Sequence, residues 1–209
     1  MTYPMTRNAR LAAALIALIA LISLAFQVQA EWIAKGDQAS VLTVIWPIMR
    51  YFTHLTNALV VIVLGACAWR GTWGKPAWIG ALAVWTVALG VVYHILLSAT
   101  HNPIGLEIWA SYGEHSIVPL ASLIFWAVAA PKVGLSAKHA VIWTAWPLGY
   151  AVYAILRGLA EGKYPYFFLD PVKSGWGLVG GYVVGLGVFF VGCGLILVWL
   201  AKILRRPLP

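Results

Sequence analysis

The chain has 209 residues, of which 62% are hydrophobic and only 10% are charged. Soluble domains are about 45–50% apolar and about 25% charged, so this composition excludes a soluble enzyme, and the aromatic content excludes a disordered chain. The formal net charge is +8, but the basic residues lie in short groups between apolar runs. That pattern indicates membrane topology rather than nucleic-acid binding.

Apolar runs long enough to cross a bilayer recur along the whole chain. A helix that spans a hydrocarbon core about 30 Å thick needs about 20 apolar residues, and the connections between the runs are short and contain Gly, Pro and charged residues. We therefore predict an all-α fold in which residues 1–209 form one transmembrane domain, a bundle of six helices. The predicted spans are 9–30, 45–69, 77–100, 112–130, 139–160 and 175–201.

The first apolar run follows Arg7 and Arg10 and also has the form of a cleavable signal peptide. Both interpretations give the rest of the chain the same orientation. With the amino terminus inside, nine basic residues lie on the inner side and three in outer loops, which is the positive-inside pattern. The inner residues are Arg7, Arg10, Arg70, Lys75, Lys132, Lys138, Lys202, Arg205 and Arg206, and the outer ones are Lys35, Lys163 and Lys173. We expect both termini to be cytoplasmic.

Polar side chains gather in the outer half of the predicted bundle. In the second span, Arg50, Thr53, His54 and Asn57 follow the i, i+3, i+4, i+7 spacing of one helix face. The other members of the set are His94, His101, His115, Arg157, Tyr164 and Asp170. Because ionisable groups inside a membrane normally face a bundle interior or a wet cavity, the set predicts a polar pocket near the outer surface.

A hydroxyl close to a histidine is the chemistry that this pocket offers most directly. Thr53 and His115 lie at similar predicted depth, and a neutral histidine can activate a weak hydroxyl nucleophile. Spacing alone does not select this pair, because other residues are also candidates for the hydroxyl or the histidine, namely Thr56, Ser98, Thr100, His54 and His94. Signatures of soluble hydrolases, such as G-x-S-x-G and H-E-x-x-H, are absent from the sequence.

Three stretches resemble a known family in their order and spacing. They are Arg50 to Thr53, His115 to Pro119 and Tyr164 to Asp170, and the family is that of the androgen-induced protein and the androgen-dependent TFPI-regulating protein, with its bacterial relatives. The resemblance extends over nearly the whole chain and implies the six-span layout. His54 and Glu114 depart from the family's pattern.

Members of that family are described as intramembrane threonine hydrolases that cleave fatty acid esters of hydroxy fatty acids. The resemblance therefore implies that Thr53 is the nucleophile and His115 the general base, acting on a lipid ester without a cofactor or metal. We expect an integral protein of a bacterial inner membrane, and the charge asymmetry described above predicts that its active site faces outward. The resemblance implies no nucleic-acid partner and no particular oligomeric state.

The remaining residues have two possible roles each. Arg50 and Arg157 suit a lipid carboxylate, a phosphate or an oxyanion, or an ion pair with Glu161. Asn57, His54 and His94 suit oxyanion donors or hydrogen bonds between helices. The loop from Tyr164 to Asp170 suits a roof over the pocket or an aromatic belt at the membrane interface, and Asp170 suits a third group that orients His115.

Two other functions stay open on the sequence. The first is a metal-dependent lipid hydrolase, because imidazole and carboxylate groups at one depth are ligands that zinc prefers. These groups are His54, His94, His101, His115 and Asp170. The second is a lipid-binding or transport protein without catalysis. In the sixth span Gly177, Gly181 and Gly185 predict a seam for close helix packing.

Overall fold

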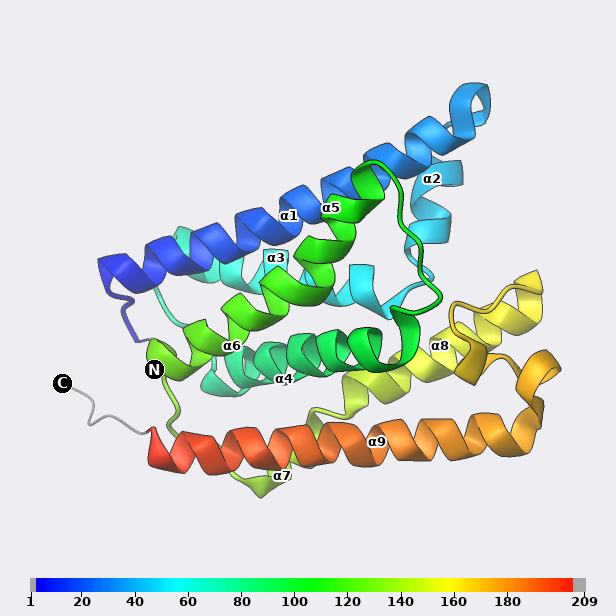
Figure 1. Cartoon of the computed structure of the whole chain (residues 1–209). Helices are drawn as coiled ribbons and strands as arrows, with labels where there is room; N and C mark the ends of the chain where they lie inside the picture. The colour runs from blue at the N-terminus through cyan, green and yellow to red at the C-terminus, as the bar shows by residue number, and fades with distance from the viewer. Residues whose placement is uncertain (1–2, 205–209) are drawn as a thin grey trace.

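The computed structural model describes residues 3–204, which form helices joined by turns (Figure 1). Within these residues, extended backbone pairs only at an isolated bridge between Pro4 and Thr72. The long helices are α1 (Arg7–Lys35), α3 (Phe52–Arg70), α4 (Pro76–Val92), α8 (Ala145–Glu161) and α9 (Pro171–Ile203). The shorter elements are η1 (Gly36–Gln38), α2 (Val41–Ile48), η2 (Tyr93–Leu97), α5 (Leu106–Tyr112), η3 (Gly113–Ile117), α6 (Val118–Val128), α7 (Ala137–Ile142) and η4 (Phe167–Leu169).

Five helical segments of the described chain are long and apolar enough to cross a membrane. They are Arg7–Gln38, Phe52–Arg70, Pro76–Leu97, Ala137–Glu161 and Pro171–Ile203. The fourth predicted span is also helical, from α5 through η3 to the end of α6, but it is not one of the five because Glu114 and His115 interrupt its apolar run. The chain is thus an all-helical membrane protein, while the sixth span and the side on which the termini lie stay predictions.

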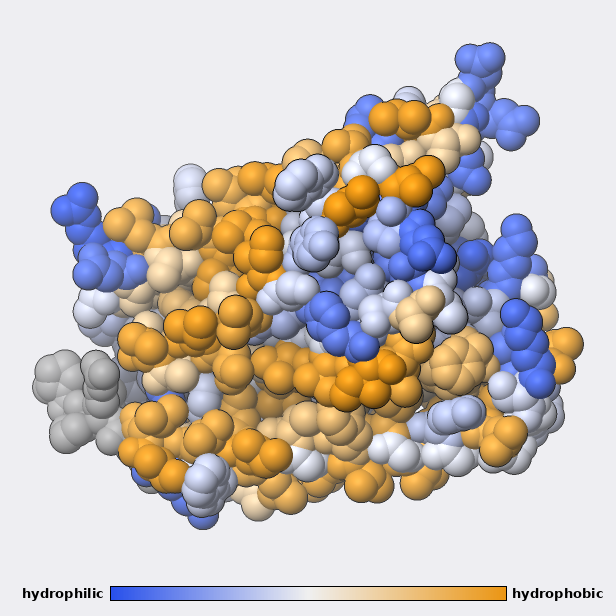
Figure 2. Space-filling model, in the orientation of Figure 1, coloured by the Kyte–Doolittle hydropathy of each residue, from blue (hydrophilic) through white to orange (hydrophobic). Residues whose placement is uncertain are grey.

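The surface agrees with an apolar surrounding. Large apolar side chains are exposed along the long helices, among them Leu15 and Leu18 of α1 and Val184 and Val188 of α9. In Figure 2 apolar residues cover most of the visible face, and hydrophilic residues gather in the half of the molecule that holds the connection between η2 and α5. The start of α1 and the end of α9 lie together at the opposite end (Figure 1).

Small residues on one face of α1 set the packing of the bundle. Ala13, Ala17 and Ala20 are buried where α1 packs against α3, α5 and α6, and small side chains let helix backbones approach closely in a membrane. Helix α4 packs against α3, α6 and α9, and α9 packs against α7 and α8. The core therefore lies around α3, α4 and α6, between α1 on one side and α9 on the other.

The second predicted span is broken, which corrects the expectation of one continuous polar face. Helix α2 ends at Ile48 and α3 begins at Phe52, so Arg50 lies in the turn between them rather than on the helix that carries Thr53. The carbonyl oxygens exposed by the break are satisfied from α8, because Tyr153 donates to Met49 (3.1 Å) and Tyr150 donates to Arg50 (2.8 Å).

The fifth predicted span is also divided, between α7 and α8. Pro147 has no N–H and its ring would clash with the carbonyl group of Trp143, four residues earlier. That carbonyl accepts instead from the indole Nε1 of Trp85, at 2.8 Å.

The glycine seam predicted in the sixth span makes no close helix contact. A Cβ atom added at Gly177, Gly181 or Gly185 would meet nothing within 4 Å among the described residues. The close approach of α9 lies further along, at Gly194, where a Cβ would be 2.8 Å from Cα of Ala140 in α7.

Two turns of the described chain are π-helical. The turn η2 follows α4, and the turn η3 connects α5 to α6. In η3 the turn precedes Pro119, whose missing N–H and bulky ring disturb the regular helix at His115. Helix α4 accommodates the displaced His115 carbonyl because Gly90 has no side chain, and a Cβ there would lie 2.8 Å from that oxygen. Gly90 therefore allows η3 to approach α4 closely.

We expect Gly90→Ala to lower the free energy of unfolding by about 1–3 kcal/mol, as over-packing usually does. The matched control is Gly185→Ala, which adds the same methyl group where α9 is open and should stabilise the helix by about 0.5–1 kcal/mol. Thermal or chemical unfolding in detergent compares the two. Equal stability of the two variants would contradict the close approach of η3 and α4.

Candidate active site

The structure brings the side chains of Thr53 and His115 into hydrogen-bond contact. Thr53 lies in the first turn of α3 and His115 in η3, and the Thr53 Oγ1 to His115 Nε2 distance is 3.2 Å. Both residues are buried, with 7% and 8% of their surface exposed. This is the geometry of a hydroxyl nucleophile and its base.

The second ring nitrogen of His115 defines the tautomer. Its Nδ1 lies 3.1 Å from the backbone carbonyl oxygen of Ser111, one turn earlier. The Ser111 hydroxyl oxygen lies farther from Nδ1, at 3.3 Å, and is able to accept as well. Because a carbonyl oxygen only accepts, we assign the proton to Nδ1, which leaves the Nε2 lone pair for the Thr53 hydroxyl. The backbone of Ser111 thus takes the orienting position that the sequence assigned to Asp170.

Tyr93, in the opposite π-turn η2, holds the imidazole face. The rings of Tyr93 and His115 stack with centroids 3.7 Å apart and an interplanar angle of 15°. The Tyr93 hydroxyl lies 3.0 Å from Ser111 Oγ and 2.9 Å from His101 Nδ1. The two π-turns therefore fix the position and rotation of the His115 ring between them, and no motif or spacing in the sequence indicates this role of Tyr93.

Thr53 opens onto an apolar cavity between α3, α4, α8 and α9. Its walls include Leu89, Ala151 and Phe190, with Tyr93 beside Thr53. Its empty space, counted together with the open space at its mouth, is about 620 Å³. His115 is not a lining residue of the cavity and contacts the wall through Thr53 Oγ1.

The first turn of α3 supplies hydrogen-bond donors beside the nucleophile. Tyr51, the N-cap residue, makes no side-chain cap, and among residues 3–204 the backbone N–H groups of Thr53 and His54 find no acceptor. Free N–H groups at a helix N-terminus carry partial positive charge. They are therefore suited to hold a developing oxyanion.

Tyr166 is a further donor, which the sequence placed in the loop from Tyr164 to Asp170 without assigning it a role. It lines the cavity, and burial raises the pKa of its phenol to about 12 against an opposing interaction with the Thr53 side chain. The hydroxyl is therefore protonated at neutral pH and able to donate. Tyr164, which the sequence favoured, packs instead against Gly158 of α8.

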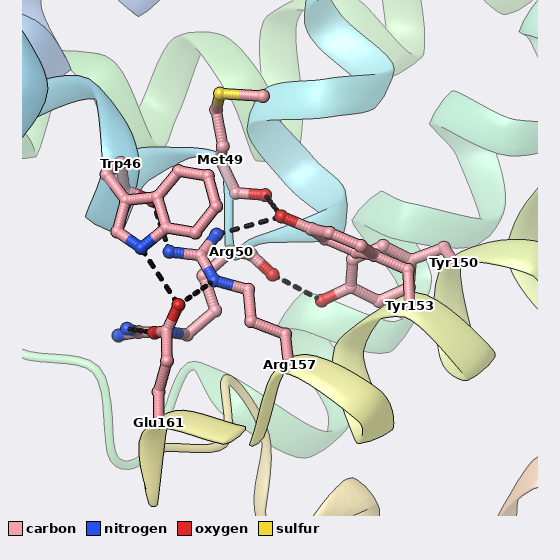
Figure 3. Close-up of polar contacts among 7 residues, drawn as sticks. All are labelled: Trp46, Met49, Arg50, Tyr150, Tyr153, Arg157 and Glu161. Atoms are coloured by element: carbon pink, nitrogen blue, oxygen red, sulfur yellow. Dashed lines mark hydrogen bonds and ion pairs between the residues drawn. The ribbon is translucent and has the colours of Figure 1, made fainter. Parts of the chain in front are cut away.

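Both intramembrane arginines bind Glu161 rather than facing the cavity (Figure 3). Arg50 Nη2 lies 2.5 Å from one carboxylate oxygen and Arg157 Nε lies 2.7 Å from the other. The Arg157 guanidinium also donates to the Trp46 carbonyl and to the Tyr153 hydroxyl, and lies over the Trp46 ring at 4.0 Å. This group, the α2–α8 clamp, consists of Trp46, Arg50, Tyr153, Arg157 and Glu161.

The other predicted polar residues form contacts between or within helices. His54 pairs with the buried Glu114, with Nδ1 to Oε2 at 2.9 Å. Asn57 donates to the Thr53 carbonyl oxygen at 3.0 Å. His94 Nε2 lies 3.0 Å from Ser116 Oγ at the exposed edge of the site.

Asp170 has a structural role at the start of α9. Its carboxylate accepts from the backbone N–H groups of Val172 and Lys173, at 2.9 Å and 3.2 Å. It is an N-cap, which explains why a carboxylate is placed there.

Within the described residues, no group of three or more His, Cys, Asp or Glu side chains is placed to hold a metal ion. The scattered histidines at this depth instead pair individually with Thr53, Glu114, Ser116 and Tyr93.

Comparison with known proteins finds no matching family model, no matching curated protein and no matching solved structure.

We expect Arg157→Met to lower the free energy of unfolding by at least about 1.5–3 kcal/mol, the contribution of one hydrogen bond to a charged group. The variant removes three donors and leaves the Trp46 carbonyl without its partner. Lys163→Met, at an exposed position just beyond α8, is the control. Unfolding in detergent measures both, and an Arg157→Met protein as stable as the control would disprove the clamp.

Proposed function

We propose that the protein is an intramembrane ester hydrolase in which Thr53 is the nucleophile and His115 the general base. The observation that carries this proposal is the 3.2 Å contact between Thr53 Oγ1 and His115 Nε2 at the wall of an apolar cavity. The tautomer set by Ser111 leaves Nε2 free to take the hydroxyl proton. The proposal agrees with the family resemblance found in the sequence.

Acylation begins when Thr53 Oγ1 attacks the ester carbonyl carbon while Nε2 of His115 takes its proton. The tetrahedral intermediate carries the negative charge on the former carbonyl oxygen, toward the free N–H groups of α3 and the Tyr166 hydroxyl. Collapse breaks the bond to the leaving oxygen, which receives the proton from His115. The alcohol departs and an acyl-threonine remains.

Deacylation repeats these steps with water. His115 Nε2 takes a proton from water as the water oxygen attacks the acyl carbon, and collapse returns the proton to Thr53 Oγ1. The products are a carboxylic acid and regenerated enzyme, so the reaction needs no cofactor or metal.

The cavity favours a lipid ester as substrate. Its walls are apolar apart from the hydroxyl-bearing residues near Thr53, and apolar walls with few polar groups orient an apolar ligand. The resemblance suggests fatty acid esters of hydroxy fatty acids, acted on in a six-span protein of a bacterial inner membrane with the site facing outward. Because Arg50 and Arg157 are paired with Glu161, we do not assign them to a substrate carboxylate.

We expect Thr53→Ala to abolish ester hydrolysis and His115→Ala to reduce kcat by about 10²–10⁴, the usual contribution of general acid–base catalysis. The assay uses detergent-purified protein, a fatty acid ester of a hydroxy fatty acid and a fluorogenic acyl ester. The control is Thr86→Ala, which removes a buried threonine hydroxyl that bonds only within α4. A fluorophosphonate probe should label the wild type at Thr53.

Three results of this assay would contradict the proposal. Activity that survives in Thr53→Ala removes the nucleophile, and activity lost with chelator favours the metal-dependent alternative. A folded wild type that hydrolyses neither ester and takes up no probe favours the lipid-binding alternative, in which lipid should copurify and Thr53→Ala should still bind it.

We expect Gly187→Leu to reduce kcat/KM for long-chain esters by about 10–100-fold, the effect of filling a hydrophobic subsite, and to leave an acetyl ester nearly unaffected. Gly187 of α9 lines the cavity, and its added side chain would lie near Leu148. Gly192→Leu, at a glycine of α9 with nothing near its Cβ, is the control. Equal losses for both esters would argue against acyl binding in this cavity.

A further inference from the structure

A second buried pair lies directly beside the proposed catalytic pair. His54 follows Thr53 on α3, and Glu114 precedes His115 in η3. The His54 Nδ1 atom lies 2.9 Å from Glu114 Oε2 and 3.2 Å from Oε1. Two bonds therefore connect the first turn of α3 to η3, through adjacent residues on both sides.

The burial of this pair is not explained by stability. Glu114 is 1% exposed, and the His54 side chain is 12% exposed. A buried ion pair loses its hydration, and replacing such a pair by apolar side chains of similar size is often neutral or stabilising. A helix packed by apolar residues alone would therefore serve the fold at least as well, so the pair points to a requirement for a specific arrangement.

The π-helical geometry of η3 explains how the two bonds run side by side. Its hydrogen bonds connect residues i and i+5, as between Gly113 and Val118, so the turn holds one residue more than an α-helical turn. Successive side chains consequently diverge less around the axis. The turn thus brings the directions of Glu114 and His115 somewhat closer than the about 100° of a regular helix, and both side chains contact the first turn of α3.

We propose that the His54–Glu114 pair is a positioning element that holds η3 against the first turn of α3 and keeps His115 Nε2 within reach of Thr53 Oγ1. This inference rests on the proposed hydrolase function. Neither residue touches the reacting atoms. A π-turn is a local widening of the helix, and the pair supplies a direct side-chain bond from this turn to α3 beside the base.

The test replaces the pair in two ways. The variant His54→Leu/Glu114→Met removes both polar side chains together, so neither is left buried without its partner and the protein should fold. The variant His54→Gln/Glu114→Gln keeps a hydrogen bond between the two side chains without charge. His139→Leu, at α7 and remote from the site, controls for the loss of a hydrogen-bonded histidine.

We expect the apolar variant to keep KM within about twofold and to lose at least about tenfold in kcat and in the rate of fluorophosphonate labelling, because misplacement of about 1 Å costs up to about 10²-fold. The Gln pair should be at least about threefold faster than the apolar variant. Size-exclusion chromatography and thermal unfolding in detergent establish that each variant is folded.

The results separate this inference from the proposed function. An active wild type with a smaller loss in the apolar variant, or with a Gln pair no faster than that variant, overturns the positioning role alone. An apolar variant that does not fold also overturns it, because the pair would then be required for the fold. A wild type without activity or labelling removes the hydrolase proposal and this inference with it.

Discussion

The break between α2 and α3 creates a problem that a membrane protein has to solve internally. In an apolar surrounding every exposed backbone group needs a partner within the protein. The carbonyl groups at the break receive theirs from Tyr150, Tyr153 and Arg157 of α8. The N–H groups of Thr53 and His54, at the start of α3, find no such partner among the described residues. The same break therefore anchors α8 and leaves donors available at the candidate nucleophile.

The position of the base follows from a second departure from regular helix. Pro119 removes a backbone donor and its ring displaces the carbonyl of His115, and the helix widens into the π-turn η3. Gly90 makes room for that carbonyl, and Tyr93 of the facing π-turn η2 stacks on the ring. These irregularities lower the stability of the helices, but they determine the position of the His115 side chain. Turns of this π type are often found at functional sites.

Sequence patterns predicted the helical bundle and the approximate positions of most spans, because apolar length alone determines which segments can cross a membrane. They failed at the irregularities. Periodicity assumes a continuous helix, so it placed Arg50 on the face of Thr53, and composition does not reveal which glycines are packed. The Thr53 and His115 pair came from a resemblance, whereas Ser111 and Tyr166 take part through a backbone carbonyl and a loop conformation that no side-chain spacing encodes.

Charge is divided within the polar half of the bundle in a way that suits an apolar ester. The two guanidinium groups share the Glu161 carboxylate in the α2–α8 clamp, and the Glu114 carboxylate contacts the His54 imidazole. The pair that faces the cavity consists of an uncharged hydroxyl and, by the tautomer that Ser111 defines, an imidazole with a free lone pair. The cavity wall carries no charged side chain, and in the proposed reaction charge arises only when Thr53 attacks. Hydrogen-bond donors near the carbonyl stabilise such a developing charge strongly, because apolar surroundings screen their dipoles only weakly.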